Sequence, residues 1–532
     1  MDGGCSSTKD FPWTDLKALI EDKALKNGSK SLMLFEDRVL TYEELNGSSN
    51  AIAHNLQKLG IQKGDHVLVF LFNGPEFLKT WFALAKLGAV AVPLNTALRR
   101  YDLTYIIKDS DSKAIFLDSA LLENYLEVRK EVGLPHEFLL TDASANPVGG
   151  MLSFQSLERG PADNLKTEIR HSDPACILYT SGTTGKPKGA ILPHFCYVNS
   201  GVAIARALGV KPGDRLFTAL PLFHIGAQLV VALPSIIADV DFVAARRFSA
   251  SRFWEQVRRH NCTIVHYLGS IAQILYQQEE KPEDRARTEI RMVGGGVQKD
   301  LWEKFEKRFG VIFLEGYGFT EGACITTWNP REKIKVGSIG KPVSHQRVEI
   351  VDENDEIVAP FARGEIAMRP EVPYSMMLGY YKNPEATLSA FRNLWFHTGD
   401  IAYKDEEGYL YFVGRKSQFI RRRGENVSAE EVEEVINAHP KVRESAVVGV
   451  PSEVGEDELK VYIVGKETSL VPEEIIKWCE ERIAYFKVPR YIEFLNELPK
   501  TETNRVQRHK LKELGLGQPW DRGKSHPQGK KN

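Results

Sequence analysis

Tyr179-Thr-Ser-Gly-Thr-Thr-Gly-Lys-Pro-Lys-Gly-Ala190 is a twelve-residue segment that combines hydroxyl side chains, glycines and two lysines. The apolar residues 175–179 precede its polar part, and the apolar residues 190–192 follow it. Each flank is short and bounded by turn-forming residues, which is typical of a β-strand. The segment therefore predicts two strands joined by a polar loop.

The loop between these strands carries groups suited to a polyphosphate. Gly182 and Gly185 allow the backbone to bend and to approach a ligand closely. The hydroxyl donors and cationic groups around them are Ser181, Thr183, Thr184, Lys186 and Lys188. A polar surface loop is the alternative interpretation.

The segment is not a P-loop of the Walker type. That motif has a glycine where this chain has Thr180, and it leads into a helix. Here Pro187 follows Lys186 and disfavours helical geometry at that lysine. A different class of nucleotide-binding site is therefore expected.

The loop resembles the signature of the adenylate-forming superfamily, which comprises acyl-CoA synthetases, luciferases and peptide-synthetase adenylation domains. The resemblance extends from about Leu40 to Leu511, with several motifs in the family's order. It implies ATP-dependent activation of a carboxylic acid, with Mg²⁺ and coenzyme A as further cofactors. It also implies a large N-terminal α/β domain with several sheets and a small mobile C-terminal α+β domain.

Composition agrees with an enzyme of more than one domain. The chain has 532 residues, which exceeds one ordinary domain, and 42% hydrophobic with 26% charged residues, which is typical of globular proteins. Its 69 basic and 71 acidic residues nearly balance, so nothing points to nucleic acid. The sequence makes no prediction of oligomeric state.

The cysteines and the apolar segments of the sequence indicate where in the cell the protein is expected. The six cysteines include no C-x-x-C pair, so neither a zinc site nor a disulfide framework is indicated, and a reducing, cytoplasmic location is expected. No secretory signal is recognisable at the N-terminus. The longest apolar region, Ile225–Ala238, contains Gln228 and Pro234 and is too short to span a bilayer.

The N-terminal half shows helices alternating with strands. Thr41 followed by Glu44 predicts a capping box at a helix start. Residues 67–72 read as a buried strand, 77–87 as a helix and 88–93 as a strand. This rhythm predicts an α/β domain with largely parallel sheets.

Two further segments are candidates for the substrate pocket. Pro221-Leu-Phe-His-Ile-Gly226 carries His224, which by resemblance lies where the carboxylate meets the α-phosphate; a core histidine is the alternative. Val293-Gly-Gly-Gly296 follows a strand over 290–293 and by resemblance faces adenine and the acyl group; a tight turn is the alternative. The pocket residues expected are Phe223, His224, Gly294, Gly296 and Tyr317.

Glu315-Gly-Tyr-Gly-Phe-Thr-Glu321 follows a strand predicted over 311–314. Tyr317 can stack on a purine, Thr320 can bond a phosphate, and Glu321 offers a hard oxygen ligand to Mg²⁺. A glycine-rich turn with a solvated carboxylate is the alternative.

The expected catalytic residues are Thr180, Lys188, His224, Glu321 and Arg505, with Thr180 and Glu321 at the metal. The other expected ATP contacts are Gly295, Gly316, Gly318, Asp400, Tyr411 and Arg415.

A domain boundary is expected after Arg415, which gives domains 1–415 and 416–532. By resemblance Asp400 binds the ribose, Arg415 contacts ribose and phosphate, and the hinge is Ser417. Within the small domain, residues 427–437 and 472–482 read as helices, and 444–450 and 459–464 as strands. At its start, Arg421, Arg422 and Gly424 are candidate coenzyme A contacts, with a solvated turn as the alternative.

The C-terminal motif departs from the family. Pro499-Lys-Thr-Glu-Thr-Asn-Arg-Val-Gln-Arg508 has Asn504 for the usual glycine and Arg505 for the usual lysine. A planar guanidinium differs in shape from an ammonium. Either Arg505 replaces the lysine, or another cation such as Lys500 does, or adenylation is impaired.

The expected function is an acid–thiol ligase that forms an acyl-adenylate and then an acyl-CoA thioester. The alternatives are an enzyme that loads a carrier protein and a non-catalytic nucleotide- or acyl-binding protein, with a luciferase-like oxygenase more remote. The resemblance is to the carnitine- or crotonobetaine-type ligases, and a medium or long fatty acid is an equal alternative substrate. A quaternary ammonium would need an aromatic cage, for which Phe223, Tyr317 and Trp328 are candidates.

Overall fold

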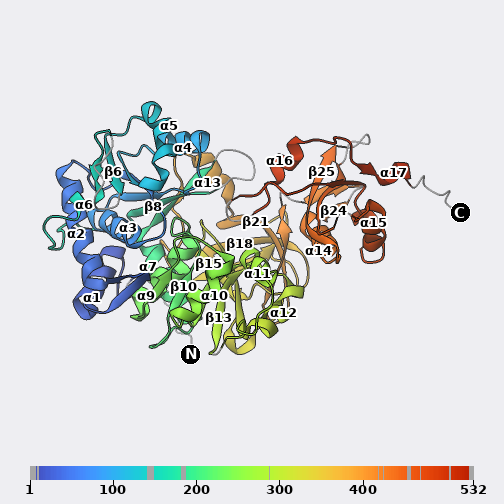
Figure 1. Cartoon of the computed structure of the whole chain (residues 1–532), viewed down its shortest axis with the longest axis horizontal. Helices are drawn as coiled ribbons and strands as arrows, with labels where there is room; N and C mark the ends of the chain where they lie inside the picture. The colour runs from blue at the N-terminus through green and yellow to red at the C-terminus, as the bar shows by residue number, and fades with distance from the viewer. Residues whose placement is uncertain are drawn as a thin grey trace. The chain divides into compact units, whose positions relative to one another are not determined.

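The computed structural model describes residues 8, 11–140, 149–180, 187–286, 288–416, 419–422, 425–451, 457–467, 469–483, 485–501 and 505–525. The chain forms two compact units (Figure 1). The first unit comprises Met1–Val348 and Met368–Phe396, and the second comprises Glu349–Ala367 and His397–Asn532.

A nine-stranded sheet of the first unit has the order β16-β15-β14-β13-β12-β10-β11-β1-β2. Its strands are β1 Ser31–Phe35, β2 Arg38–Thr41, β10 Leu216–Thr218, β11 Phe242–Ala244, β12 Ile264–Leu268, β13 Ile290–Gly295, β14 Val311–Phe319, β15 Cys324–Trp328 and β16 Lys341–Pro342. The pairings from β1 through β11, β10, β12 and β13 to β14 are all parallel. The carboxyl ends of these six strands therefore meet at one edge, where open α/β sheets bind ligands.

An eight-stranded sheet has the order β19-β9-β8-β4-β3-β5-β6-β7. Its strands are β3 His66–Phe70, β4 Val90–Pro93, β5 Ala114–Asp118, β6 His136–Leu140, β7 Leu152–Ser153, β8 Pro174–Thr180, β9 Lys188–Pro193 and β19 Gly379–Tyr380. Strands β8 and β9 pair antiparallel on either side of the polar loop, which confirms the predicted strands flanking it. The remaining pairings from β8 to β7 are parallel, as expected.

Helices α1 Leu16–Asn27, α2 Tyr42–Lys58 and α3 Pro75–Leu87 pack together at the N-terminal, blue part of the fold (Figure 1). The predicted capping box of α2 is confirmed, because the Thr41 hydroxyl accepts the Glu44 N–H while the Glu44 carboxylate accepts the Thr41 N–H. The other helices of this unit are α4 Arg100–Asp109, α5 Leu122–Val132, α6 Phe154–Leu157, α7 His194–Ala207, α8 Ile225–Ala227, α9 Leu233–Ala238, α10 Ala250–Arg259, α11 Gly269–Tyr276, α12 Lys299–Phe309 and α13 Pro384–Ala390.

The apolar region 225–238 folds as α8, a π-helical turn over Gln228–Ala232, and α9. Most of its side chains are buried, so it belongs to the protein core. Among the helices of the described residues, none is long and apolar enough to cross a membrane.

A five-stranded sheet has the order β17-β18-β21-β20, with β22 paired to β21. Its strands are β17 Gln346–Val351, β18 Gly364–Pro370, β20 Phe391–Arg392, β21 Trp395–Lys404 and β22 Leu410–Arg415. Within the second unit, β21 and β22 form an antiparallel hairpin in which Asp400 is opposite Arg415.

The rest of the second unit is an α+β fold. A ribbon of β23 Phe419–Arg422 and β24 Glu425–Ser428 precedes a sheet of β25 Val442–Pro451, β26 Asp457–Gly465, β27 Tyr491–Phe494 and β28 Trp520–Asp521. Its helices are α14 Ala429–Asn437, α15 Pro472–Glu480, α16 Arg508–Glu513 and α17 Arg522–Ser525. The helix expected from Val427 begins at Ala429 instead, because β24 pairs with β23 up to Ser428, whose hydroxyl caps the helix.

Candidate functional site

The two strands that flank the polar loop hold its ends close together. Thr180 at the end of β8 is paired with Lys188 at the start of β9. The Tyr179 hydroxyl donates to Asp109 at 2.6 Å, and the Tyr105 hydroxyl donates to the carbonyl of Pro187 at 3.2 Å. The predicted ATP contacts Ser181, Gly182, Thr183, Thr184 and Gly185 lie outside the described residues.

A cluster of three oxygen-bearing side chains forms beside this loop. The Tyr380 hydroxyl donates to Glu321 Oε1 at 2.8 Å, and the Thr180 hydroxyl lies 3.4 Å from the same oxygen. We call Thr180, Glu321 and Tyr380 the carboxylate cluster. Lys188 Nζ lies 5.2 Å from the centre of the Tyr380 ring, close enough for a cation–π contact. The structure thus brings together Thr180, Lys188 and Glu321, which the sequence predicts as catalytic.

Tyr380 is a member of this cluster that sequence reasoning missed. It lies on β19, where it pairs with Ala190 of β9, so the sheet places it next to a segment 190 positions earlier in the chain. Burial and the neighbouring Glu321 carboxylate raise the pKa of the Tyr380 hydroxyl well above its ordinary value. Tyr380 therefore stays protonated and donates to Glu321 at all physiological pH values.

The carboxylate cluster fits a magnesium ion. Carboxylate and hydroxyl oxygens are hard ligands, and Mg²⁺ usually takes one or two protein ligands and completes its shell with phosphate oxygens and water. Glu321 and Thr180 provide such oxygens next to the cationic Lys188. Among the described residues, no group of three His, Cys, Asp or Glu side chains is placed to hold a metal ion.

In the segment 315–321, residues 315–319 continue strand β14 and Glu321 lies in the turn that follows, so the whole segment is not a glycine-rich turn. Strand β14 continues to Phe319, and Tyr317 pairs with Thr327 of β15. The reversal occurs only after Thr320, whose carbonyl accepts the N–H of Ala323 at 3.1 Å. The hairpin thereby holds Glu321 at its tip, in the carboxylate cluster.

The glycines of these two segments allow close packing between backbones. A Cβ on Gly294 would lie 2.0 Å from the carbonyl oxygen of Tyr267, and one on Gly295 would lie 2.7 Å from that of Gly316. Gly316 itself lies against the ring of Trp328, whereas Gly318 is exposed. Their ligand contacts stay a prediction, because strand packing alone already requires glycine at most of these positions.

Glu315 is a second residue that sequence reasoning missed. Its buried carboxylate accepts hydrogen bonds from the Tyr267 hydroxyl and from the backbone N–H groups of Gly296 and Val297. Burial raises the pKa of Glu315 to about 8, and these three donors act against that rise. Glu315 thereby ties β14 to the Gly296 turn, whose φ of 89° favours glycine. Its role is to hold the turn in place.

His224 lies at the carboxyl edge of the nine-stranded sheet. It caps α8, and its ring contacts the buried ring of Phe223 at a centroid distance of 4.6 Å. The residue is exposed to water although protein atoms crowd around its ring. This crowding lowers the pKa of His224 to about 4, so the imidazole is neutral at pH 7.

A second group of predicted residues lies together within the second unit. Arg415 Nε lies 3.0 Å from Asp400 Oδ1, and Asp400 is only 2% exposed. Tyr411 stacks on Tyr403 across the same hairpin, with ring centroids 4.8 Å apart, and its hydroxyl donates to Asp405 at 3.2 Å. Asp400 and Arg415 thus form a largely buried carboxylate–guanidinium pair, and their contacts with ribose and phosphate stay a prediction.

Arg505 is near this pair. Arg505 is exposed, but crowding by its surroundings and the charge of Arg415 lower its pKa, while Asp400 acts in the opposite direction. The backbone N–H of Arg505 donates to the Thr501 hydroxyl at 3.1 Å. Lys500, the alternative cation, forms an ion pair with Glu444. Arg505 is therefore the better candidate for the position of the family's lysine.

One of the three residues expected to contact coenzyme A in the second unit is buried. Arg422 is 1% exposed, lies 2.6 Å from Glu458 and donates to the carbonyl of Val488 at 2.8 Å. Its guanidinium thus has a structural role inside the fold and is not presented to a ligand. Arg421 lies on β23, and Gly424 and the predicted hinge Ser417 lie outside the described residues.

The described residues thus combine an α/β fold with a carboxylate cluster suited to Mg²⁺. Comparison with known families gives a match to the AMP-binding enzyme family over residues 20–381 and to the AMP-binding enzyme C-terminal domain over residues 431–505. The chain belongs to the AMP-binding enzyme family.

Coenzyme A ligases are among its relatives. Crotonobetaine/carnitine–CoA ligase of Salmonella choleraesuis (strain SC-B67) is 33% identical over 511 residues, which cover 94% of this chain and 99% of the relative. The enzyme of the same name from Citrobacter koseri (strain ATCC BAA-895 / CDC 4225-83 / SGSC4696) is also 33% identical, with the same coverage.

Solved structures agree with this relationship. The anthranilate CoA ligase AuaEII in complex with anthranoyl-AMP has a TM-score of 0.86 and 26% identity, and the match covers 95% of this chain and 98% of that one. The o-succinylbenzoate CoA synthetase MenE of Bacillus subtilis, in complex with ATP and a magnesium ion, has a TM-score of 0.80 and 28% identity, over 93% of this chain and 99% of that one. The predicted fold class and superfamily are confirmed: this chain is an AMP-forming acid–thiol ligase that uses ATP and Mg²⁺ to make an acyl-adenylate and then an acyl-CoA.

Proposed function

We propose that the enzyme activates its carboxylic acid beside the carboxylate cluster and then transfers the acyl group to coenzyme A. The observation that supports this assignment is the convergence of Thr180 and Tyr380 on Glu321, next to Lys188. Attack of a carboxylate on a triphosphate is opposed by charge repulsion, which the site must neutralise. A bound Mg²⁺ ion would supply part of that neutralisation.

Each residue of the first unit then has a defined task. Lys188 provides positive charge at the end of the phosphate-binding loop, and Glu321 with Thr180 provides oxygen ligands for the metal. Tyr380 holds the Glu321 carboxylate in one orientation through its 2.8 Å hydrogen bond. The neutral His224 ring can donate a hydrogen bond to the reacting carboxylate without adding charge.

The second unit contributes the remaining groups. In this proposal Asp400 and Arg415 contact the ribose, and Arg505 takes the place of the family's lysine during adenylation. In this proposal the mobile small domain comprises residues 416–532, which are part of the second unit. It rotates about Ser417 between adenylation and thioester formation. Closure of this kind admits the thiol only after pyrophosphate has left.

The substrate class is proposed from the relatives and from the aromatic residues. Two relatives are named for crotonobetaine and carnitine, which are carboxylic acids with a quaternary ammonium group. Phe223, Tyr317 and Trp328 are the aromatic residues expected from the sequence to attract such a cation, and two of them, Phe223 and Trp328, are buried. We therefore propose a betaine-type acid, with a medium or long fatty acid as the competing candidate.

Free thiols at the described Cys176, Cys196, Cys262 and Cys479 support a reducing, cytoplasmic location.

The test is formation of a thioester from ATP, Mg²⁺, coenzyme A and each member of an acid panel. The panel contains crotonobetaine, carnitine, octanoate, palmitate and benzoate. A betaine-type acid should give at least a tenfold higher kcat/KM than any other member. Thioester on a carrier protein but not on coenzyme A would favour the carrier-loading alternative. ATP binding without turnover of any acid would favour the non-catalytic alternative.

A further inference from the structure

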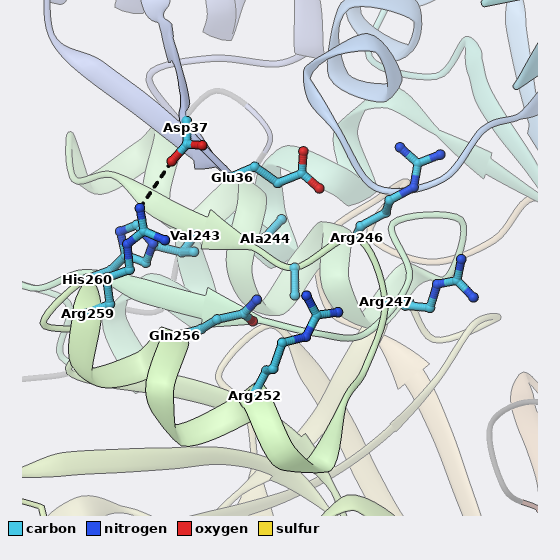
Figure 2. Close-up of a pocket in the computed structure, with 11 residues that line it drawn as sticks. Glu36, Asp37, Val243, Ala244, Arg246, Arg247, Arg252, Gln256, Arg259 and His260 are labelled. Atoms are coloured by element: carbon cyan, nitrogen blue, oxygen red, sulfur yellow. Dashed lines mark hydrogen bonds and ion pairs between the residues drawn. The ribbon is translucent and has the colours of Figure 1, made fainter.

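A hollow of about 170 Å³ in the first unit is bordered by arginines (Figure 2). Arg246 and Arg247 follow β11, and Arg252 and Arg259 lie on α10; the acidic residues of the lining are Glu36 and Asp37. We call this cavity the basic hollow. None of the residues of the carboxylate cluster lines it, so it is a site separate from that cluster.

Two of these guanidinium groups have acidic partners and two do not. Arg259 lies 3.1 Å from Asp37, the contact drawn as a dashed line in Figure 2, and Arg246 lies 3.3 Å from Asp118. Arg247 and Arg252 are exposed and have no acidic partner within ion-pair distance among the described residues. The lining carries four guanidinium groups against the two carboxylates of Glu36 and Asp37, so the hollow retains a net positive charge, although Arg247 also lies over the ring of Phe72 at 5.8 Å.

The size and chemistry of the basic hollow fit a phosphate group. Guanidinium groups bind phosphate oxygens through paired hydrogen bonds of fixed geometry. A cavity of about 170 Å³ holds several water molecules and thus a phosphoryl group. It is smaller than the roughly 300 Å³ and more of pockets that enclose a whole drug-sized ligand. The rest of such a ligand would therefore lie outside the hollow.

The fold connects the basic hollow to the segment that carries His224. Strands β10 and β11 are parallel neighbours, so the His224 segment and the Arg246–Arg247 segment leave the sheet at the same edge. The Asn73 side chain links the two segments, because its amide donates to the carbonyls of Leu220 at 3.0 Å and Ala245 at 2.8 Å. Its carbonyl oxygen also accepts the N–H of Leu222 at 2.7 Å. The two segments are thus held in a fixed relative position.

We propose that the basic hollow binds a phosphate group of the coenzyme A nucleotide, with Arg247 and Arg252 as its principal contacts. The pantetheine arm then follows the carboxyl edge of the sheet toward the His224 segment. This assignment rests on the proposed function, in which coenzyme A is the acyl acceptor. It also replaces the expected contact at Arg422, whose guanidinium is buried against Glu458.

The test compares the R247Q/R252Q double variant with wild type and with R258Q. Arg258 is an exposed arginine of the same helix that does not line the hollow and donates to the carbonyl of Glu283. The KM for coenzyme A should rise about tenfold in the double variant and stay within twofold in R258Q. ATP–pyrophosphate exchange without thiol should be equal in all three proteins, which also shows that the variants are folded.

A second arm identifies the source of the phosphate. Adenosine 3′,5′-bisphosphate should inhibit wild type competitively with coenzyme A, and its inhibition constant should rise by the same factor in the double variant. An inhibitor that loses affinity in the double variant but does not compete with coenzyme A would assign the hollow to a separate nucleotide and overturn the proposal.

Different results would refute the assignment of the basic hollow and the proposed ligase function. An unchanged KM for coenzyme A in the double variant, or an equal rise in R258Q, would overturn the assignment of the hollow and leave the ligase activity intact. Wild-type protein that exchanges pyrophosphate but makes no coenzyme A thioester would instead refute the proposed function, and this assignment with it.

Discussion

Replacement of Tyr380 by phenylalanine tests the carboxylate cluster most selectively. The change removes one hydroxyl and keeps the aromatic ring, so the cation–π contact with Lys188 is preserved. The lost hydrogen bond is 2.8 Å long and reaches a carboxylate. The remaining donor from Thr180 is at 3.4 Å, which is long for an O–H donor. Glu321 Oε1 therefore loses its stronger protein hydrogen bond.

The expected size of the effect follows from this geometry. A hydrogen bond to a charged group contributes about 1.5–3 kcal/mol, and the half-buried position of Tyr380 places this one near the lower end. A loss of about 1.4 kcal/mol from the transition state corresponds to a tenfold slower reaction. We expect pyrophosphate release by Y380F to be about tenfold slower at saturating acid, and the half-saturating Mg²⁺ concentration to rise.

The matched control is Y381F. Tyr381 is the next residue in the chain, but its hydroxyl donates to Asp111 at 2.9 Å, away from the carboxylate cluster. Its loss should change pyrophosphate release by less than twofold. A Y380F enzyme within twofold of wild type, or an equal decrease in both variants, would refute the role given to Tyr380.

Three further outcomes are expected. E321Q replaces a charged metal ligand with a neutral one and should slow ATP–pyrophosphate exchange about a hundredfold, partly restored by excess Mg²⁺; exchange at the wild-type rate would contradict its role. R505A should slow adenylation about a hundredfold, whereas R505K should slow it by less than tenfold. Both variants should still convert supplied acyl-adenylate to thioester. Loss of thioester formation in both variants would contradict a role for Arg505 in adenylation. Burial lowers the pKa values of His194, His266 and His345 to about 4, 3 and 4. The unfolded chain therefore binds more protons than the folded chain at these histidines below pH 6.5, so their contribution to the free energy of unfolding should be constant above that pH and fall toward pH 4 by up to about 1.4 kcal/mol per pH unit for each histidine. The raised pKa values of Glu315, about 8, and Glu433, about 7, act in the opposite direction between pH 8 and pH 4.5. An H266Q variant whose urea midpoint changes between pH 7.5 and pH 5 by the same amount as in wild type would contradict the histidine contribution.

Local signals in the sequence predicted local structure well. The capping box at Thr41 and the strands on either side of the polar loop depend on residues close together in the chain, and both are confirmed. The motif also gave Glu321 as a metal ligand, and that role stays a prediction although Glu321 does lie beside Thr180. The extension of β14 through residues 315–319 was not predicted, because glycines in sequence favour a turn whereas pairing with β15 stabilises a strand.

Contacts between distant segments could not be predicted in this way. Tyr380 meets Glu321 and Lys188 only because β19 joins β9 in the eight-stranded sheet. Arg422 was expected at a ligand, but its ion pair with Glu458 depends on the contact of β23 with β26. Three consecutive arginines in a sequence do not reveal which of them is buried.

The most direct test of the central claim is pyrophosphate release from ATP and Mg²⁺ across the acid panel, with and without coenzyme A. The account predicts release with one class of acid, accelerated by coenzyme A and accompanied by one equivalent each of AMP and acyl-CoA. ATP that binds without release for any acid, in the presence of coenzyme A, would contradict the account.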